Sequence, residues 1–312
     1  MNAAMAAVDS MGNPGLRRDR SVEIVVEIGA VPITLRTGDA AFARMVTERY
    51  AGFARSIGFA RSTRASEDLP GIVFDIELME LPLEAIEQDF DGAAAREECT
   101  DDDLEVTQER GVWLIARGDF SARWNSLTGH GTIRQTANPY SLDSVLRIVH
   151  SLVLAQRGEF LAHAASAIRN GRAFLFAGVS GAGKTTISRL APPDVTLLTD
   201  EISYVRKSDA AAERTPPYVA YGTPFAGELA RIGTNCSAPL STLYLLRQGP
   251  ENRIDEIPAT VAVEALLRNT LFFARDPELV NRVFSGACEF VDRVPVRQLT
   301  FRKDASVWEL IG

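Results

Sequence analysis

Hydrophobic and polar residues alternate along several short segments of the first 135 residues, which is typical of strands with one buried face. Residues 42–57 differ because their apolar side chains recur near helical spacing, so we expect one helix there. One helix among short strands predicts a small α+β domain over residues 21–135, preceded by a disordered tail at residues 1–20. The expected strands are residues 22–28, 33–36, 72–78, 104–108, 112–117 and 121–124.

From residue 136 onward the apolar runs become longer. Residues 141–156 carry an apolar face at helical spacing and are followed by Gly158, which predicts a helix. Residues 160–168 and 173–177 are expected to be strands joined by a turn at Asn170-Gly171, and the second is apolar throughout, as in a strand buried on both faces. These patterns favour an α/β domain over residues 136–312. Its other expected elements are helices at 185–190 and 261–273 and strands at 195–199, 202–206, 218–221, 240–246 and 294–299.

The segment after strand 173–177 fits the phosphate-loop pattern G-x-x-x-x-G-K-T/S at every fixed position. Its glycines allow several backbone N–H groups to turn toward an anion, and the following helix directs its positive end at the same point. Lys184 is expected to reach the β- and γ-phosphates of ATP, and the Thr185 hydroxyl to bind Mg²⁺. The alternative is a glycine-rich turn without function. The residues expected to contact the nucleotide are Gly178, Ser180, Gly181, Ala182, Gly183, Lys184, Thr185 and Thr186.

Two acidic residues, Asp200 and Glu201, follow the next expected strand. A carboxylate at a strand end beside a phosphate loop can bind Mg²⁺, directly or through water, or accept a proton from a hydroxyl. The alternative is a strand-end turn with two solvated acids. His163 lies in the strand paired with the one that leads into the loop, so the turn could bring it beside the γ-phosphate; a satisfied core histidine is the other interpretation. The predicted metal ligands are Thr185, Asp200 and Glu201.

Composition narrows the class of protein. The net charge is −8 and the isoelectric point about 5.1, which argues against sequence-independent binding of nucleic acid. Three widely spaced cysteines argue against a zinc site and suit a reducing cytoplasm, and the first 20 residues lack the apolar core of a secretory signal. The most apolar helical stretch, residues 145–154, is too short to cross a membrane and is interrupted by Arg147 and His150. The acidic run at residues 89–105 is interpreted as a solvated loop rather than a metal or basic-partner site.

The residues from His163 through the loop to Glu201 resemble the HPr kinase/phosphorylase group and, more closely, related proteins with a phosphoenolpyruvate-carboxykinase-type P-loop fold. The loop also resembles that of the ATP-dependent carboxykinases, whose chains are far longer. The resemblance implies a mixed β-sheet with flanking helices, a variable N-terminal domain, and phosphorylation of a serine hydroxyl on a protein or peptide. It implies catalytic roles for His163, Lys184 and Asp200, with Asp200 as the base. The sequence departs from that group at His163-Ala164 (there His-Gly), at Lys184-Thr185-Thr186 (there Lys-Ser-Glu) and at Asp200-Glu201 (there Asp-Asp), which disfavours HPr itself as the acceptor.

These expectations combine into a cytoplasmic kinase that depends on ATP and Mg²⁺ and acts on an unidentified protein or peptide, as a monomer or homo-oligomer, without nucleic-acid or membrane partners. Two alternatives remain: a nucleotide-responsive binding module without phosphate transfer, and a kinase for a small molecule. Residues 222–228 could cover the nucleotide, receive the acceptor or form a plain surface loop. The arginines considered for stabilising the transferred phosphoryl group are Arg231, Arg268, Arg275 and Arg282.

Overall fold

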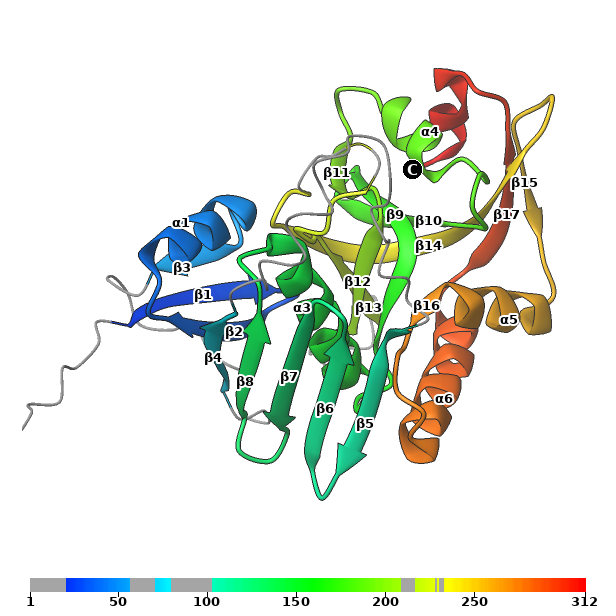
Figure 1. The fold of residues 1–312 in the computed structure, drawn as a ribbon. Coiled ribbons are helices and arrows are strands. Elements are labelled where there is room, and N and C mark those ends of the chain that lie inside the picture. The colour runs from blue at the N-terminus through cyan, green and yellow to red at the C-terminus, as the bar shows by residue number, and fades with distance from the viewer. Residues whose placement is uncertain (1–20, 57–70, 80–102, 209–216, 228, 230–232) are drawn as a thin grey trace, which may run out of the picture.

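The computed structural model describes residues 21–56, 71–79, 103–208, 217–227, 229 and 233–312. Its elements form two sheets with helices around the second (Figure 1). The predicted tail at residues 1–20 and most of the acidic run at residues 89–105 lie outside the described residues. No helix within those residues is long and apolar enough to cross a membrane.

The first sheet has the strand order β3-β1-β2-β4-β8-β7-β6-β5. Strand β4 runs parallel to both β2 and β8, whereas the other neighbours are antiparallel. In the strands of this sheet, buried and more exposed residues alternate, so one face of the sheet is buried. In β1, for example, Ile24, Val26 and Ile28 are buried and the residues between them are less so. The elements are β1 (Val22–Ile28), β2 (Val31–Thr37), α1 (Ala40–Arg49), β3 (Ala54–Ser56), β4 (Ile72–Leu78), β5 (Glu105–Glu109), β6 (Val112–Arg117), β7 (Phe120–Asn125) and β8 (His130–Gln135).

The second sheet closes on itself. Strand β10 pairs with β9 on one side and with β14 on the other, so β10, β9, β12, β13 and β14 form a ring, and β17 and β15 continue from β14. Short strands β11 and β16 both pair with β9. The strands are β9 (Phe160–Arg169), β10 (Arg172–Ala177), β11 (Thr196–Thr199), β12 (Ile202–Lys207), β13 (Tyr218–Tyr221), β14 (Ser237–Gln248), β15 (Arg253–Glu256), β16 (Thr270–Leu271) and β17 (Val296–Phe301). The helices are α3 (Pro139–Ala155), α4 (Lys184–Arg189), α5 (Ala259–Asn269), α6 (Pro277–Arg293) and the 3-10 helix η3 (Ala305–Leu310).

Helix α3 joins the two sheets. It begins at Pro139, where the side chain of Asn138 accepts a hydrogen bond from the backbone N–H of Tyr140. Most of its residues are buried, and they share one hydrophobic core with the first sheet and with Leu161 and Tyr204 of the second. The domain boundary expected near residue 135 coincides with the end of strand β8. The two parts nevertheless pack together through this shared core.

Buried polar contacts hold the same junction. Asp143 of α3 accepts hydrogen bonds from the side chains of Arg49 and Tyr50, which end helix α1. Arg206 of β12 pairs with Glu159 at 3.4 Å and donates to the carbonyl of Gly29 at 2.9 Å. Since an unpaired buried charge is costly, these contacts favour one fixed arrangement of the two sheets.

Several expected elements are wrong in their bounds. The helix expected at residues 42–57 ends at Arg49, because residues 54–56 pair with β1 as strand β3 instead. The helix expected at 261–273 ends at Asn269, since Thr270 and Leu271 pair with β9. Strands β8 and β15 and the long helix α6 were not expected. The strands at 72–78, 112–117, 218–221 and the buried strand at 173–177 are confirmed.

His150 on α3 gives the core a predicted pH dependence. It is fully buried, its Nδ1 lies 3.2 Å from the Tyr204 hydroxyl, and burial lowers its pKa to about 3. The unfolded chain takes up the proton near the ordinary pKa of about 6.5, whereas the folded protein does not, so stability falls as pH drops from 6.5 toward 3. We expect the wild type to lose about 2 kcal/mol of unfolding free energy between pH 7 and pH 5 through this residue.

The measurement is urea unfolding of the wild type and of His150→Asn, which keeps a polar partner for Tyr204, at a series of pH values. Between pH 7 and pH 5, the unfolding free energy of His150→Asn should fall by less than that of the wild type, and the difference should equal that amount. This holds whatever the stability of the variant at pH 7. His130→Asn, at an exposed histidine, is the matched control. Identical pH slopes for His150→Asn and the wild type would contradict the prediction.

Candidate active site

The glycine-rich loop joins buried strand β10 to helix α4. Strand β10 lies between β9 and β14, so the loop emerges from the middle of the closed sheet. Gly183 has φ of 114°, and a Cβ there would lie 2.6 Å from the ring of Phe301. A Cβ at Gly178 would lie 2.7 Å from that of Ala182. Both positions therefore require glycine, because a side chain there would collide with Phe301 or Ala182. Loops that wrap a phosphate need glycine for the same kind of close packing.

Lys184 turns back into this loop. Its side chain is largely buried, and Nζ donates to the carbonyl of Gly178 at 3.0 Å. The loop is also held by Gln248 of β14, whose side-chain amide donates to the carbonyl of Gly181 at 2.7 Å. The ammonium thus stands at the mouth of the loop. Of the other residues expected to contact the nucleotide, Ser180 and Gly181 are exposed and Ala182, Thr185 and Thr186 are half-buried.

Helix α4 contributes less to phosphate binding than expected from the sequence. It has only six residues, and the buried Trp308 indole donates a hydrogen bond to the carbonyl of Ile187 at 3.2 Å. A helix this short adds little field of its own. Any phosphate binding therefore depends on the loop amides and Lys184.

Asp200 is buried and already engaged by the backbone. It follows β11, which pairs with β9 and not with β10, so β9 separates it from the strand that carries the loop. Its Oδ1 accepts from the backbone N–H of Gly227 at 3.1 Å and its Oδ2 from that of Leu229 at 2.9 Å. The segment around Gly227 is therefore anchored on this carboxylate, rather than forming a plain surface loop.

The two acidic side chains converge. A carbon built as a side chain on Gly227 would lie 2.6 Å from Glu201 Oε2 and 3.1 Å from Asp200 Oδ2. Two carboxylates at one point suit Mg²⁺, which usually takes one or two of them and fills its other positions with water and phosphate oxygens. Among the residues that the structure describes, no group of three or more His, Cys, Asp and Glu side chains is placed to hold a metal ion, so this pair would need Thr185, water and phosphate oxygens to complete a Mg²⁺ site.

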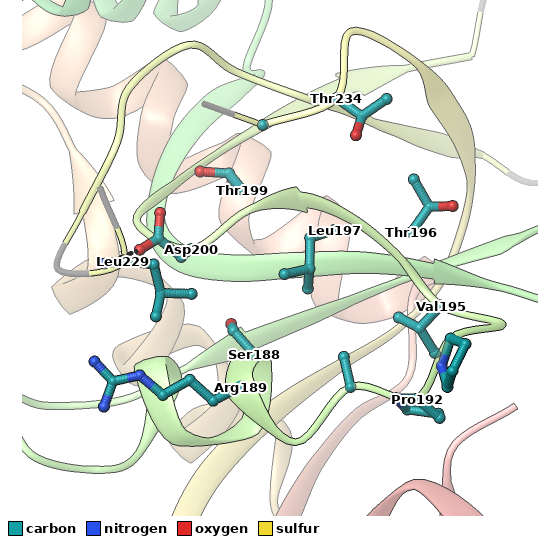
Figure 2. Close-up of a pocket in the computed structure, with 13 residues that line it drawn as sticks. Ser188, Arg189, Pro192, Val195, Thr196, Leu197, Thr199, Asp200, Leu229 and Thr234 are labelled. Atoms are coloured by element: carbon teal, nitrogen blue, oxygen red, sulfur yellow. Dashed lines mark hydrogen bonds between the residues drawn. The ribbon is translucent and has the colours of Figure 1, made fainter. Parts of the chain in front are cut away.

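A cavity of about 560 Å³ opens beside Asp200, between the C-terminal end of α4 and strand β11. Figure 2 shows Asp200, Thr199 and Leu229 along one side of it and Ser188 and Arg189 along another. None of residues 178–187 lines this cavity. Asp200 therefore forms part of the wall of a cavity that the loop residues do not line.

His163 connects the acidic pair to the loop. In the β9–β10 ladder Ala164 faces Ala177, which brings His163 beside Gly178, the first loop residue. Its Nδ1 lies 3.4 Å from Glu201 Oε1, and its side chain is 42% exposed, so it is no core histidine. Burial lowers its pKa, as do the nearby charges of Lys184 and Arg147, while Glu201 opposes the shift. The imidazole is therefore neutral at neutral pH.

Sequence analysis missed Arg147, which reaches this cluster from α3. Its guanidinium lies over the Phe225 ring at 5.0 Å, and its charge acts on the carboxylates of Asp143 and Glu201 and on His163. The signal was a charged residue inside an otherwise apolar helix. The arginines considered earlier lie elsewhere: Arg268 and Arg282 pair with Glu264 and Glu278 one helical turn away, Arg275 is exposed, and Arg231 lies outside the described residues.

Comparison with known proteins corrects the family assignment. A search of curated proteins finds no match. The family model for SynChlorMet cassette protein ScmC matches residues 132–312, a range that contains the loop, His163 and both acidic residues. The resemblance to the HPr kinase group is therefore wrong as an identification. It rested on a glycine-rich loop and two strand-end acids, which are short local features that different families can share. The chain belongs to the family of SynChlorMet cassette protein ScmC.

Proposed function

We propose that this protein is a kinase that uses ATP with Mg²⁺ and transfers the γ-phosphate to a hydroxyl, expected to be a serine, of a protein or peptide. The observation that carries the proposal is Lys184 folded into a glycine loop, with a converging pair of carboxylates and a half-exposed histidine next to it. Phosphate transfer asks a protein mainly for positioning and charge neutralisation. The cytoplasm, where MgATP is abundant, is the compartment we propose.

Each residue has a part in this scheme. The loop amides and Lys184 would hold the phosphates, and Thr185 with the two carboxylates would hold Mg²⁺, which supplies charge neutralisation on the β- and γ-phosphates when bound. Asp200 would accept the proton of the acceptor hydroxyl as its oxygen bonds to the γ-phosphorus and the bond to the β–γ bridging oxygen breaks, releasing ADP. Neutral His163 would orient Glu201 through their 3.4 Å contact.

A nucleotide-responsive binding module is the second candidate, and one observation favours it. Both oxygens of Asp200 are already hydrogen-bonded to the segment at Gly227 and Leu229, as expected of a carboxylate that fixes a loop. Nucleotide bound at the loop could then act on this segment and, through the core shared with the first sheet, on a partner.

Incubation with MgATP and fractions of a cell lysate, followed by intact-mass measurement, tests the proposal. We expect one protein or peptide to gain a single phosphate with the wild type and none to do so with Lys184→Ala. If the purified protein binds MgATP and a broad set of fractions shows no phosphorylated partner, the kinase proposal fails and the binding module is favoured.

A further inference from the structure

His163 lines a second cavity. It has a volume of about 320 Å³ and is formed where the first sheet, α3, β9 and the segment after α5 meet. Leu104 belongs to the chain leading into β5, Arg147 to α3, and Leu271, Phe272 and Phe273 to the segment from β16 onward. A space of this size is at the lower end of the range of about 300–1,000 Å³ that ligand pockets span.

The cavity is adjacent to the phosphate loop. His163 lines it and precedes Ala164, which pairs with Ala177 at the end of the β9–β10 ladder. Gly178 follows Ala177 and accepts the hydrogen bond from Lys184 Nζ. His163 further contacts Glu201. A group that enters the cavity as far as His163 therefore approaches the acidic pair and the phosphate loop.

The charge of Arg147 in its wall is only partly compensated, because the carboxylates of Asp143 and Glu201 act on it without forming an ion pair. Three other arginines with largely covered side chains, Arg49, Arg117 and Arg206, each pair with a carboxylate. Arg147 forms no ion pair with another described residue, and its buried Nε has no hydrogen-bond partner. Burial lowers its pKa, so the charged form is destabilised as it stands. A carboxylate bound beside it would offset that cost.

We propose that this cavity binds the acceptor, and that Arg147 pairs with a carboxylate of an acceptor segment that also carries apolar side chains. The inference rests on the proposed function and adds its substrate class: a hydroxyl-bearing peptide segment that is acidic and apolar. Leu271, Phe272 and Phe273 contact the apolar side chains, while the serine lies toward His163 and the loop.

Serine-centred peptide libraries labelled with fluorescein test this assignment on the full chain. Three pools share Leu and Phe at half of the flanking positions and carry Asp and Glu, Asn and Gln, or Lys and Arg at the rest. Anisotropy with a non-hydrolysable MgATP analogue gives binding, and mass spectrometry with MgATP gives phosphate transfer. We expect the wild type to bind the acidic pool about tenfold or more tightly than the neutral pool.

The variants make the assignment specific. Arg147→Gln should lose the preference for the acidic pool, Arg147→Lys should keep most of it, and Arg147→Glu should shift it to the basic pool, which a purely structural role would not do. If Arg147→Glu fails to fold, the Gln and Lys variants decide. Arg268→Gln, which removes an exposed arginine of α5, should bind all pools like the wild type.

Equal binding of the three pools by the wild type, or an acidic preference that survives in Arg147→Gln, overturns the inference. Failure of the proposed function has a different signature: acidic binding that depends on Arg147, with no phosphate transferred to any pool. Phosphate transfer to all pools without preference would support the kinase proposal but contradict the proposal that this cavity selects an acidic acceptor.

Discussion

Replacing Lys184 by alanine should weaken binding of MgATP by roughly 10–100-fold and reduce phosphate transfer below detection. A charge-assisted hydrogen bond to a phosphate contributes about 1.5–3 kcal/mol. The ammonium also holds the carbonyl of Gly178 at 3.0 Å, so its loss relaxes the loop as well as removing a charge. Transfer suffers more than binding because negative charge on the γ-phosphate must be neutralised as the bond breaks.

Titration calorimetry with MgATP measures the binding, and the intact-mass assay measures the transfer. Lys303→Ala, at an exposed lysine after β17, is the matched control and should behave like the wild type. Thermal unfolding of both variants separates a lost contact from a lost fold. Wild-type affinity for MgATP in Lys184→Ala would contradict nucleotide binding at this loop.

Local patterns were sufficient for many of the strands. Alternation in β4 and the continuous apolar run of β10 depend on which faces are buried, and a strand shows that in its own residues. Helix α6 shows the same kind of signal, since Asp276 caps it, Pro277 begins it, and Leu279, Val283 and Phe290 recur at helical spacing. Local spacing and capping were therefore sufficient to predict this helix as well.

Other bounds depend on partners distant in the chain. Tyr50 and Phe53 are both buried and continue the apolar spacing of α1, although the helix ends at Arg49. The chain turns there because residues 54–56 gain backbone hydrogen bonds with β1. The end of α5 at Asn269 has the same cause in β9. Spacing alone cannot show such competition between a helix and a strand.

In the candidate site too, local features could be predicted from the sequence, whereas contacts between distant segments could not. The loop and its lysine are local, and the Asn170-Gly171 turn was enough to place His163 beside the loop. Arg147 comes from a helix sixteen residues before His163, and its neighbours depend on how two sheets pack. The contacts of Asp200 with Gly227 and Leu229 likewise required the three-dimensional structure.

Replacement of Asp200 by asparagine should separate the kinase from the binding module. We expect phosphate transfer to fall by at least about 1,000-fold, because an amide cannot accept the hydroxyl proton or bind Mg²⁺ as a carboxylate does. Affinity for MgATP should change by less than about tenfold, since Lys184 and the loop remain and one lost ligand is worth at most about 1.4 kcal/mol on that scale.

The substitution also carries a structural cost that must be measured beside it. Asparagine keeps one acceptor oxygen and turns an NH₂ group toward the second backbone N–H, so one of the contacts to Gly227 and Leu229 is lost. Leaving that buried donor without a partner costs about 1–3 kcal/mol of unfolding free energy.

Asp276→Asn is the matched control, because the Asp276 carboxylate also accepts a backbone N–H, from Leu279 at 2.8 Å, but at the start of α6. Both variants should lose stability in urea unfolding, whereas only Asp200→Asn should lose transfer. If the protein is instead a binding module, Asp200→Asn should still change its partner binding when nucleotide is added, after correction for the fraction of unfolded protein. Transfer at the wild-type rate in that variant would remove Asp200 as the proton acceptor and leave it the role of holding the segment at Gly227.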